Sequence, residues 1–184
     1  RSWVASRLFR RTATISGGRE NDVKGDGGSI SGGWGNTAAS YAVVGGGQYN
    51  FSMGNHSTIS GGIGNTNSRE YATIGGGSDN NASGVASIVP GGFANSAAGD
   101  FSFAAGLRAK ANHSGSFVWA DSQGADFSSA FNNQFLVRAQ FAGFNRATRI
   151  TPAEVFGIRA EIDNDYGGMY VETSGANGRP FYGY

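Results

Sequence analysis

One short pattern decides the fold of this chain: Ile59-Ser-Gly-Gly-Ile-Gly-Asn65 is followed fifteen residues later by Ile74-Gly-Gly-Gly-Ser-Asp-Asn80. An aliphatic residue, a glycine pair and an asparagine recur in this way six times, at steps of 14 or 15 residues. In the order aliphatic residue, first glycine, asparagine, the copies are Ile15, Gly17, Asn21; Ile30, Gly32, Asn36; Val44, Gly46, Asn50; Ile59, Gly61, Asn65; Ile74, Gly76, Asn80; and Val89, Gly91, Asn95. Helical hairpin repeats need roughly 30 residues or more. The shorter period predicts one turn of a parallel β-solenoid, in which each position stacks on the same position of the next turn about 4.8 Å away.

The columns of this repeat predict an inner and an outer face, because successive strand residues point to opposite sides. The aliphatic column shares its face with small residues two positions earlier: Ala13, Gly28, Ala42, Ser57, Ala72, Ser87 and Ser102. The outer face is then expected to carry Thr14, Ser29, Val43, Thr58, Thr73, Ile88 and Phe103. The glycine pair marks a corner that needs positive φ or close backbone approach. The asparagines mark a second corner, where we expect a left-handed backbone and a stacked amide ladder.

Composition excludes several classes of site. The 184 residues include 32 Gly, two His and no Cys, and the net charge is +1. The lack of Cys rules out a disulfide scaffold, a thiolate zinc site and an iron–sulfur cluster. A balanced charge gives no field that steers the chain to nucleic acid or a membrane, and no apolar run approaches the roughly 20 residues of a span. We therefore expect no cofactor, no metal, no nucleic acid and no membrane contact within this chain.

The repeats predict a thin core, because each turn buries one aliphatic side chain and some Ala or Ser. Residues 27–99 carry only three charges, on Arg69, Glu70 and Asp79. A free solenoid surface normally carries more charge than this, and oligomerisation is a common remedy for a thin core. We therefore expect one face of the solenoid to pack against other copies of the chain.

Three segments are expected along the chain: an N-terminal basic segment (1–11), a β-roll repeat domain (12–122) of about seven to eight turns, and a smaller β-rich module (123–184). The run 115–121 is interpreted as a last, larger turn that closes the solenoid. In the module, strands are expected at 133–139, 155–162 and 168–173, with a turn at 163–168 and a weak helix start at 151–154. The chain is read as a piece of a longer protein that continues beyond residue 184.

The segments Asn80-Asn-Ala-Ser-Gly84-Val-Ala-Ser-Ile-Val-Pro-Gly-Gly92 and Asn95-Ser-Ala-Ala-Gly99-Asp-Phe-Ser-Phe-Ala-Ala-Gly106 resemble the head repeat of YadA-like trimeric autotransporter adhesins. The resemblance covers roughly residues 12–122. It implies a left-handed parallel β-roll, a homotrimer, and an extracellular adhesive head held on the bacterial outer membrane by a segment not present here. The chain departs from that family in its longer repeat and in the lack of heptads after Trp119. The expected function is a structural and adhesive head for multivalent surface attachment; the alternative is a phage tail-fibre or extracellular filament subunit of the same architecture.

Side-chain candidates for function are few. Aromatic residues near the corners are expected either to bind a host or environmental surface glycan or protein, or to fill the trimer interface: Trp34, Tyr41, Tyr49, Phe51, Tyr71, Phe93 and Phe101. Rows of Thr suggest lattice or ice binding, but Val43, Ile88 and Phe103 interrupt them.

Calcium and catalysis are the remaining alternatives. Residues 22–26 and 163–165 carry clustered oxygens, which a turn also explains. Asp121 and Asp126 are the nearby carboxylate pair late in the roll, and His56 and His113 each lie in an Asn-His-Ser loop. Because the repeats carry almost no titratable groups, we do not expect an enzyme.

Overall fold

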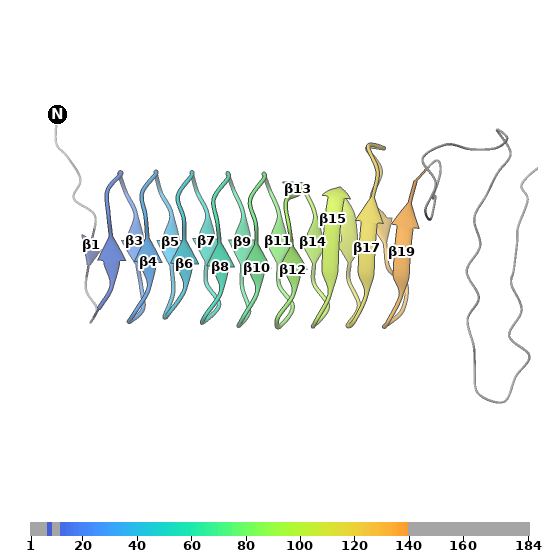
Figure 1. Ribbon diagram of the computed structural model, residues 1–184, viewed down its shortest axis with the longest axis horizontal. Coiled ribbons are helices and arrows are strands. Elements are labelled where there is room, and N and C mark those ends of the chain that lie inside the picture. The colour runs from blue at the N-terminus through green and yellow to red at the C-terminus, as the bar shows by residue number, and fades with distance from the viewer. Residues whose placement is uncertain (1–6, 9–11, 140–184) are drawn as a thin grey trace, which may run out of the picture. The chain divides into compact units, whose positions relative to one another are not determined.

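The computed structural model describes residues 7–8 and 12–139, which form a parallel β-solenoid of about eight turns with no helix (Figure 1). Two sheets, A and B, run along it. Sheet A consists of β1 (Arg7–Leu8), β3 (Asp22–Val23), β5 (Thr37–Ala38), β7 (Phe51–Ser52), β9 (Thr66–Asn67), β11 (Asn81–Ala82), β14 (Ser96–Ala97), β16 (Ala109–Ala111) and β18 (Phe127–Ser128). Sheet B consists of β2 (Thr14–Ile15), β4 (Ser29–Ile30), β6 (Val43–Val44), β8 (Thr58–Ile59), β10 (Thr73–Ile74), β12 (Ile88–Val89), β15 (Phe103–Leu107), β17 (Phe117–Ala120) and β19 (Phe135–Arg138), with β13 (Gly92–Phe93) paired beside β15.

The register of the sheets follows the sequence repeat. Ile59 pairs with Ile74 and Thr58 with Thr73, each fifteen residues apart, and these strand pairs are parallel. A 14-residue step places Val44 on Ile30, and another places Phe117 on Phe103. The prediction of an all-β parallel solenoid is therefore confirmed, and the hand of the coil stays a prediction.

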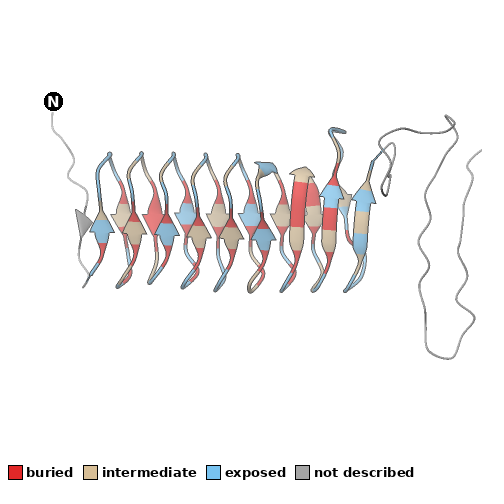
Figure 2. Ribbon diagram, viewed as in Figure 1, coloured by how far each residue is buried: buried red, intermediate tan, exposed pale blue. Residues whose placement is uncertain are grey.

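The core lies between the two sheets (Figure 2). The aliphatic column is fully buried from Ile30 to Val89, and the small column beside it is buried as well. Sheet A closes the core with its own inward column: Val23, Ala38, Ser52, Asn67, Ala82, Ala97 and Ala111. Outward residues such as Thr73 and Ile88 stay partly or fully exposed, as the period-2 pattern predicts.

The glycine edge is the corner at which each sheet B strand passes to the next sheet A strand. Its first glycine is near extended (Gly61 φ 159°), whereas the second has a left-handed φ (Gly62 φ 92°). A Cβ atom on Gly62 would collide with the carbonyl oxygen of Gly77 in the next turn. Only glycine fits this second position, because it lacks the atom that would collide.

The asparagine column forms a buried ladder, as expected. Asn65 Nδ2 donates to Asn50 Oδ1 at 3.1 Å, and Asn80 Nδ2 donates to Asn65 Oδ1 at 3.1 Å. The expected left-handed backbone at these asparagines is wrong: the positive φ belongs to the residue before each one, as at Tyr49 (52°) and Asp79 (56°). The residue before each asparagine makes the turn, and the asparagine amide points into the core.

The coil continues past residue 122, where the sequence predicts that the repeat domain ends. The run 115–121 contains β17, and β19 pairs with it through Phe117 and Phe135. The step from Lys110 to its partner Ser128 is 18 residues instead of 15, because residues 121–126 form an added loop. All of these strands belong to the compact unit Arg1–Arg138. The strands, turn and helix start expected at 151–173 lie outside the described residues.

Candidate functional site

The outer face of sheet B carries no charged residue along its whole described length. We define this face by two positions in each turn: the first outward residue of the sheet B strand and the residue two places after it. They are Thr14, Ser16, Ser29, Ser31, Val43, Gly45, Thr58, Ser60, Thr73, Gly75, Ile88, Pro90, Phe103, Ala105, Phe117, Trp119, Phe135 and Val137. Hydroxyl and small residues predominate at its N-terminal end and aromatic residues at its C-terminal end.

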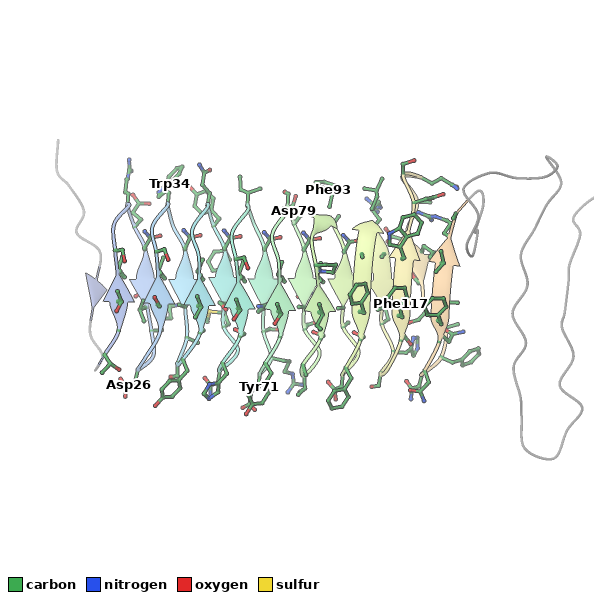
Figure 3. The ribbon with its side chains drawn as sticks, in the orientation of Figure 1. Asp26, Trp34, Tyr71, Asp79, Phe93 and Phe117 are labelled. Atoms are coloured by element: carbon green, nitrogen blue, oxygen red, sulfur yellow. The ribbon has the colours of Figure 1, made fainter. Side chains whose placement is uncertain are left out.

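Three phenylalanines stack along the C-terminal part of this face. The ring centroids of Phe103 and Phe117 are 4.6 Å apart at 7°, and those of Phe117 and Phe135 are 4.8 Å apart at 18°. Trp119 and Val137 beside them are exposed, and Phe135 is 63% exposed. Figure 3 labels Phe117, which lies on β17. A large apolar patch of this kind on a water-facing surface is typical of an interaction site.

The aromatic corner lies opposite the glycine edge, where each sheet A strand passes to sheet B. The ring of His56 stacks between those of Tyr41 (4.9 Å, 5°) and Tyr71 (5.6 Å, 11°). All three residues have a left-handed backbone, with φ of 57°, 55° and 61°, and all three are exposed. Phe101 occupies the same column with φ 57° and is 72% exposed. In Figure 3, Tyr71 lies at this edge and Trp34 at the opposite one.

A polar hollow of about 240 Å³ adjoins the ring ladder. Its lining residues are Met53, Gly54, Asn55, Ser68, Arg69 and Glu70. Asn55 directly precedes His56, and Glu70 directly precedes Tyr71, so the hollow and the ladder share two turns of the corner. The side chains of Arg69 and Glu70 are exposed, and among the described residues neither takes part in a hydrogen bond or an ion pair that the structure shows.

The aromatic residues singled out from the sequence fall into separate places. Tyr41, Tyr71 and Phe101 lie at the aromatic corner, and Phe51 lies on the outer face of sheet A. Trp34, Tyr49 and Phe93 lie at the glycine edge. The structure therefore does not gather them into one surface.

Trp34 belongs to a small cluster at the glycine edge. Its Nε1 donates to Glu20 Oε2 at 2.8 Å, and its ring contacts that of Tyr49 at a centroid distance of 4.9 Å and a tilt of 52°. Arg19 lies over the other side, 5.4 Å from the ring centroid. The hydrogen bond from Trp34, followed by that from Arg19, lowers the pKa of Glu20 below its usual value.

The late carboxylates are tied to arginines. Asp126 Oδ1 lies 2.7 Å from Arg108 Nε, and Asp121 Oδ1 lies 2.8 Å from Arg138 Nε. Burial raises the pKa of Asp121, but hydrogen bonds from Gln123 and Arg138 outweigh it and leave the pKa lowered. Arg138 also donates to the carbonyl oxygens of Gln123 and Ala125, so it clamps the added loop. The contacts of Asp121 and Asp126 with the arginines therefore serve to hold the added loop in place.

The other sequence candidates are dispersed. Asp22 lies on β3 and Asp26 in the aromatic corner, and no three potential metal ligands cluster within residues 12–139. The segment 163–165 lies outside the described residues. His113 is partly buried, and its Nδ1 lies 2.9 Å from Ser129 Oγ, which accepts the backbone N–H groups of Asn112 and His113. In the part of the chain that the structure describes, no helix is long and apolar enough to cross a membrane.

Two features were missed from the sequence: the stacked phenylalanines beyond Phe103, and the hollow beside Tyr71. The repeat step offered a signal for both, because Phe117 follows Phe103 by one turn and Arg69 replaces the glycine of its column. The column-by-column geometry is the basis for any assignment, since no model of a known protein family matches the chain and no curated protein matches it in sequence.

Proposed function

We propose that this chain is a self-associating extracellular β-solenoid, a homotrimeric head that displays a repeated surface for attachment. The observation that carries the proposal is the charge-free outer face of sheet B. A solvated face would normally mix charges of both signs, which keep a protein soluble. Here eighteen outward positions in nine strands lack them, and the aromatic end remains open to water.

A second copy in the same register would cover this face with its own counterpart. Parallel copies bring equal turns side by side, so that the phenylalanine ladder meets the phenylalanine ladder. Burying a large apolar side chain contributes roughly 1.5–3 kcal/mol. Three copies are proposed because of the resemblance to trimeric heads, and a location on a bacterial cell surface is proposed for the same reason.

Attachment is proposed for the surfaces that self-association leaves free. The aromatic corner repeats along the coil and over the copies, so weak contacts there add up by multivalency. We propose a role without catalysis, and the pairing of Asp121 and Asp126 with arginines supports it.

Light scattering coupled to size exclusion tests self-association directly. A mass near three times 19.0 kDa is expected for the wild-type chain. Phe117→Ser, which introduces the residue found at Ser29 in the same column, should shift the mass toward one chain. Phe51→Ser on the outer face of sheet A is the matched control and should leave the mass unchanged. A wild-type monomer overturns the proposal, and a mass that keeps growing with concentration would favour the filament subunit instead.

A further inference from the structure

We propose that the hollow beside Tyr71 is a carbohydrate-binding site, in which Arg69, Glu70 and Asn55 form hydrogen bonds to one sugar unit. The proposal rests on the proposed function in one respect, since it names the class of ligand that the attachment surface takes. The site lies at the aromatic corner and draws on two successive turns.

One turn of the solenoid differs from its neighbouring turns at three positions, two of which line this hollow. Arg69 stands where the turns on either side have Gly54 and Gly84, and Glu70 is the only acidic residue in its column between Asp26 and Asp100. Asn67 stands in the inward column of sheet A, where the other strands from β3 to β16 have Ser, Ala or Val. Stability alone favours the consensus residues, so the joint departures indicate a specific use of this turn.

The chemistry of the hollow suits a neutral, hydroxyl-rich ligand. A guanidinium offers only donors, a carboxylate offers only acceptors, and an amide offers both. Each sugar hydroxyl both donates and accepts, so it needs this mixture. An anion would meet the negative charge of Glu70, and a cation would meet the positive charge of Arg69.

Asn67 holds the corner in place from inside the core. Its Nδ2 donates to the carbonyl oxygens of Thr58 at 2.8 Å and Ala72 at 3.0 Å. These bonds tie β9 both to β8, which contains Thr58, and to Ala72, which follows the corner. Its Oδ1 is buried and has no hydrogen-bond partner among the described residues. An unpaired buried acceptor destabilises the fold. A rigid support that costs stability is typical of a site whose groups must be held in position.

The exposed rings beside the hollow are also unfavourable for folding alone. Left-handed φ is unfavourable for a residue with a side chain, and the same column has glycine at 27 and 115. Tyr71 takes this conformation while remaining 56% exposed, so burial does not explain the choice. A ring at the rim offers an apolar surface to the C–H groups of a sugar, while the polar groups of the hollow orient it.

The size of the hollow limits the ligand. About 240 Å³ falls below the roughly 300–1,000 Å³ of sites for drug-sized molecules, so it fits one sugar unit of a longer chain. An open hollow with exposed charges binds weakly as a single site. Several copies of the chain would raise the apparent affinity through multivalency.

The test uses the full chain, fluorescently labelled, on an array of immobilised neutral and acidic oligosaccharides. The variant Arg69→Gly with Glu70→Ser inserts residues that the same corner uses at Gly54 and Ser40, so the fold should be kept. Asp79→Gly is the matched control: it removes a charge at the opposite edge and introduces the residue present at Gly64.

The wild-type chain should bind a subset of neutral sugars, and the double variant should lose at least about tenfold in binding, because two charge-assisted hydrogen bonds are removed. The control should bind like the wild type. No sugar bound by the wild type, or equal binding by the double variant, overturns the site. Light scattering on the same samples separates the two proposals: a trimer that binds no sugar refutes only the site, and a monomer that binds sugar refutes only self-association.

Discussion

Replacing Asn65 by Ala removes the middle rung of the asparagine ladder and should destabilise the solenoid strongly. Asn65 Nδ2 donates to Asn50 Oδ1 (3.1 Å), Gly61 O (3.1 Å) and Gly77 O (2.9 Å). Its Oδ1 accepts from the backbone N–H and from the side-chain amide of Asn80, at 3.0 and 3.1 Å. All of these groups lie at a fully or partly buried position, so water does not replace the lost side chain.

The magnitude follows from which groups lose their partner. The backbone N–H of Asn80 loses its acceptor inside the core, which costs about 1–3 kcal/mol. Gly77 O keeps the N–H of Ile63 at 3.0 Å, whereas Gly61 O and the Asn50 amide oxygen each lose one donor. Adding these weaker losses at about 1 kcal/mol each gives a total decrease in the free energy of unfolding of about 3–5 kcal/mol.

Equilibrium unfolding in urea, followed by far-UV circular dichroism, measures this decrease. Protein concentration must be equal for all variants, because self-association contributes to apparent stability. Asn81→Ala is the matched control: the same side chain is exposed on β11, and its loss should change the stability by less than about 0.5 kcal/mol. Equal midpoints for the two variants would refute the reasoning that the ladder holds the glycine edge together.

Three further outcomes are expected. Gly64→Ala should cost about 1 kcal/mol, because its left-handed φ opposes a side chain and the Cβ meets only the movable carboxylate of Asp79. Gly62→Ala should cost at least twice as much, because its Cβ meets backbone, and urea midpoints compare the two variants. Trp34→Phe should raise the pKa of Glu20 toward its ordinary value in an NMR titration, since the indole donor is lost. Because the folded-state pKa is lowered, the contact stabilises the fold at a pH above the unfolded-state pKa. This stabilisation is lost as the pH falls through the folded-state pKa. Arg138→Ala should release the added loop and speed its cleavage by a protease while the earlier turns stay protected, which mass mapping of the fragments would show.

The sequence predicts the columns well because each follows from one local rule. Period 2 within a strand and period 15 between turns place Ile59 inside and Thr58 outside without any knowledge of tertiary contacts. The asparagine ladder is also foreseeable, since stacked amides are the simplest way to satisfy a buried asparagine. The backbone conformation at that corner is not foreseeable in the same way, because the tendency of Asn toward left-handed φ points to the wrong residue. The asparagine instead keeps its amide buried, and the residue before it takes the left-handed φ. Burial depends on the whole coil and not on local sequence.

The end of the coil is hard to place from the repeat for a different reason. The insertion of residues 121–126 breaks the 15-residue step, so Phe135 no longer falls where the repeat expects it, although it pairs with Phe117 in register. The aromatic corner keeps its period from Tyr41 to Phe101: Tyr41, His56 and Tyr71 are each fifteen residues apart. Propensity rules assign positions of left-handed φ to Gly or Asn, so they do not predict that aromatic residues adopt this backbone conformation.

In a coil of this kind, function is found where a turn differs from its neighbours. Stacking fixes the inward residues of every turn, because each must fit the same position above and below. Outward residues carry no such constraint, so a row of like residues, such as the phenylalanines of sheet B, indicates a surface used along its length. A single altered turn indicates instead a site at one place on the coil. Arg69, Glu70 and the buried Asn67 all differ from the residues of the neighbouring turns. Asn67 supports from the core the corner that presents Arg69 and Glu70. If Asn67→Ala weakens sugar binding while Arg69 and Glu70 are intact, the turn acts as one unit; if it leaves binding unchanged, the hollow needs no support from the core.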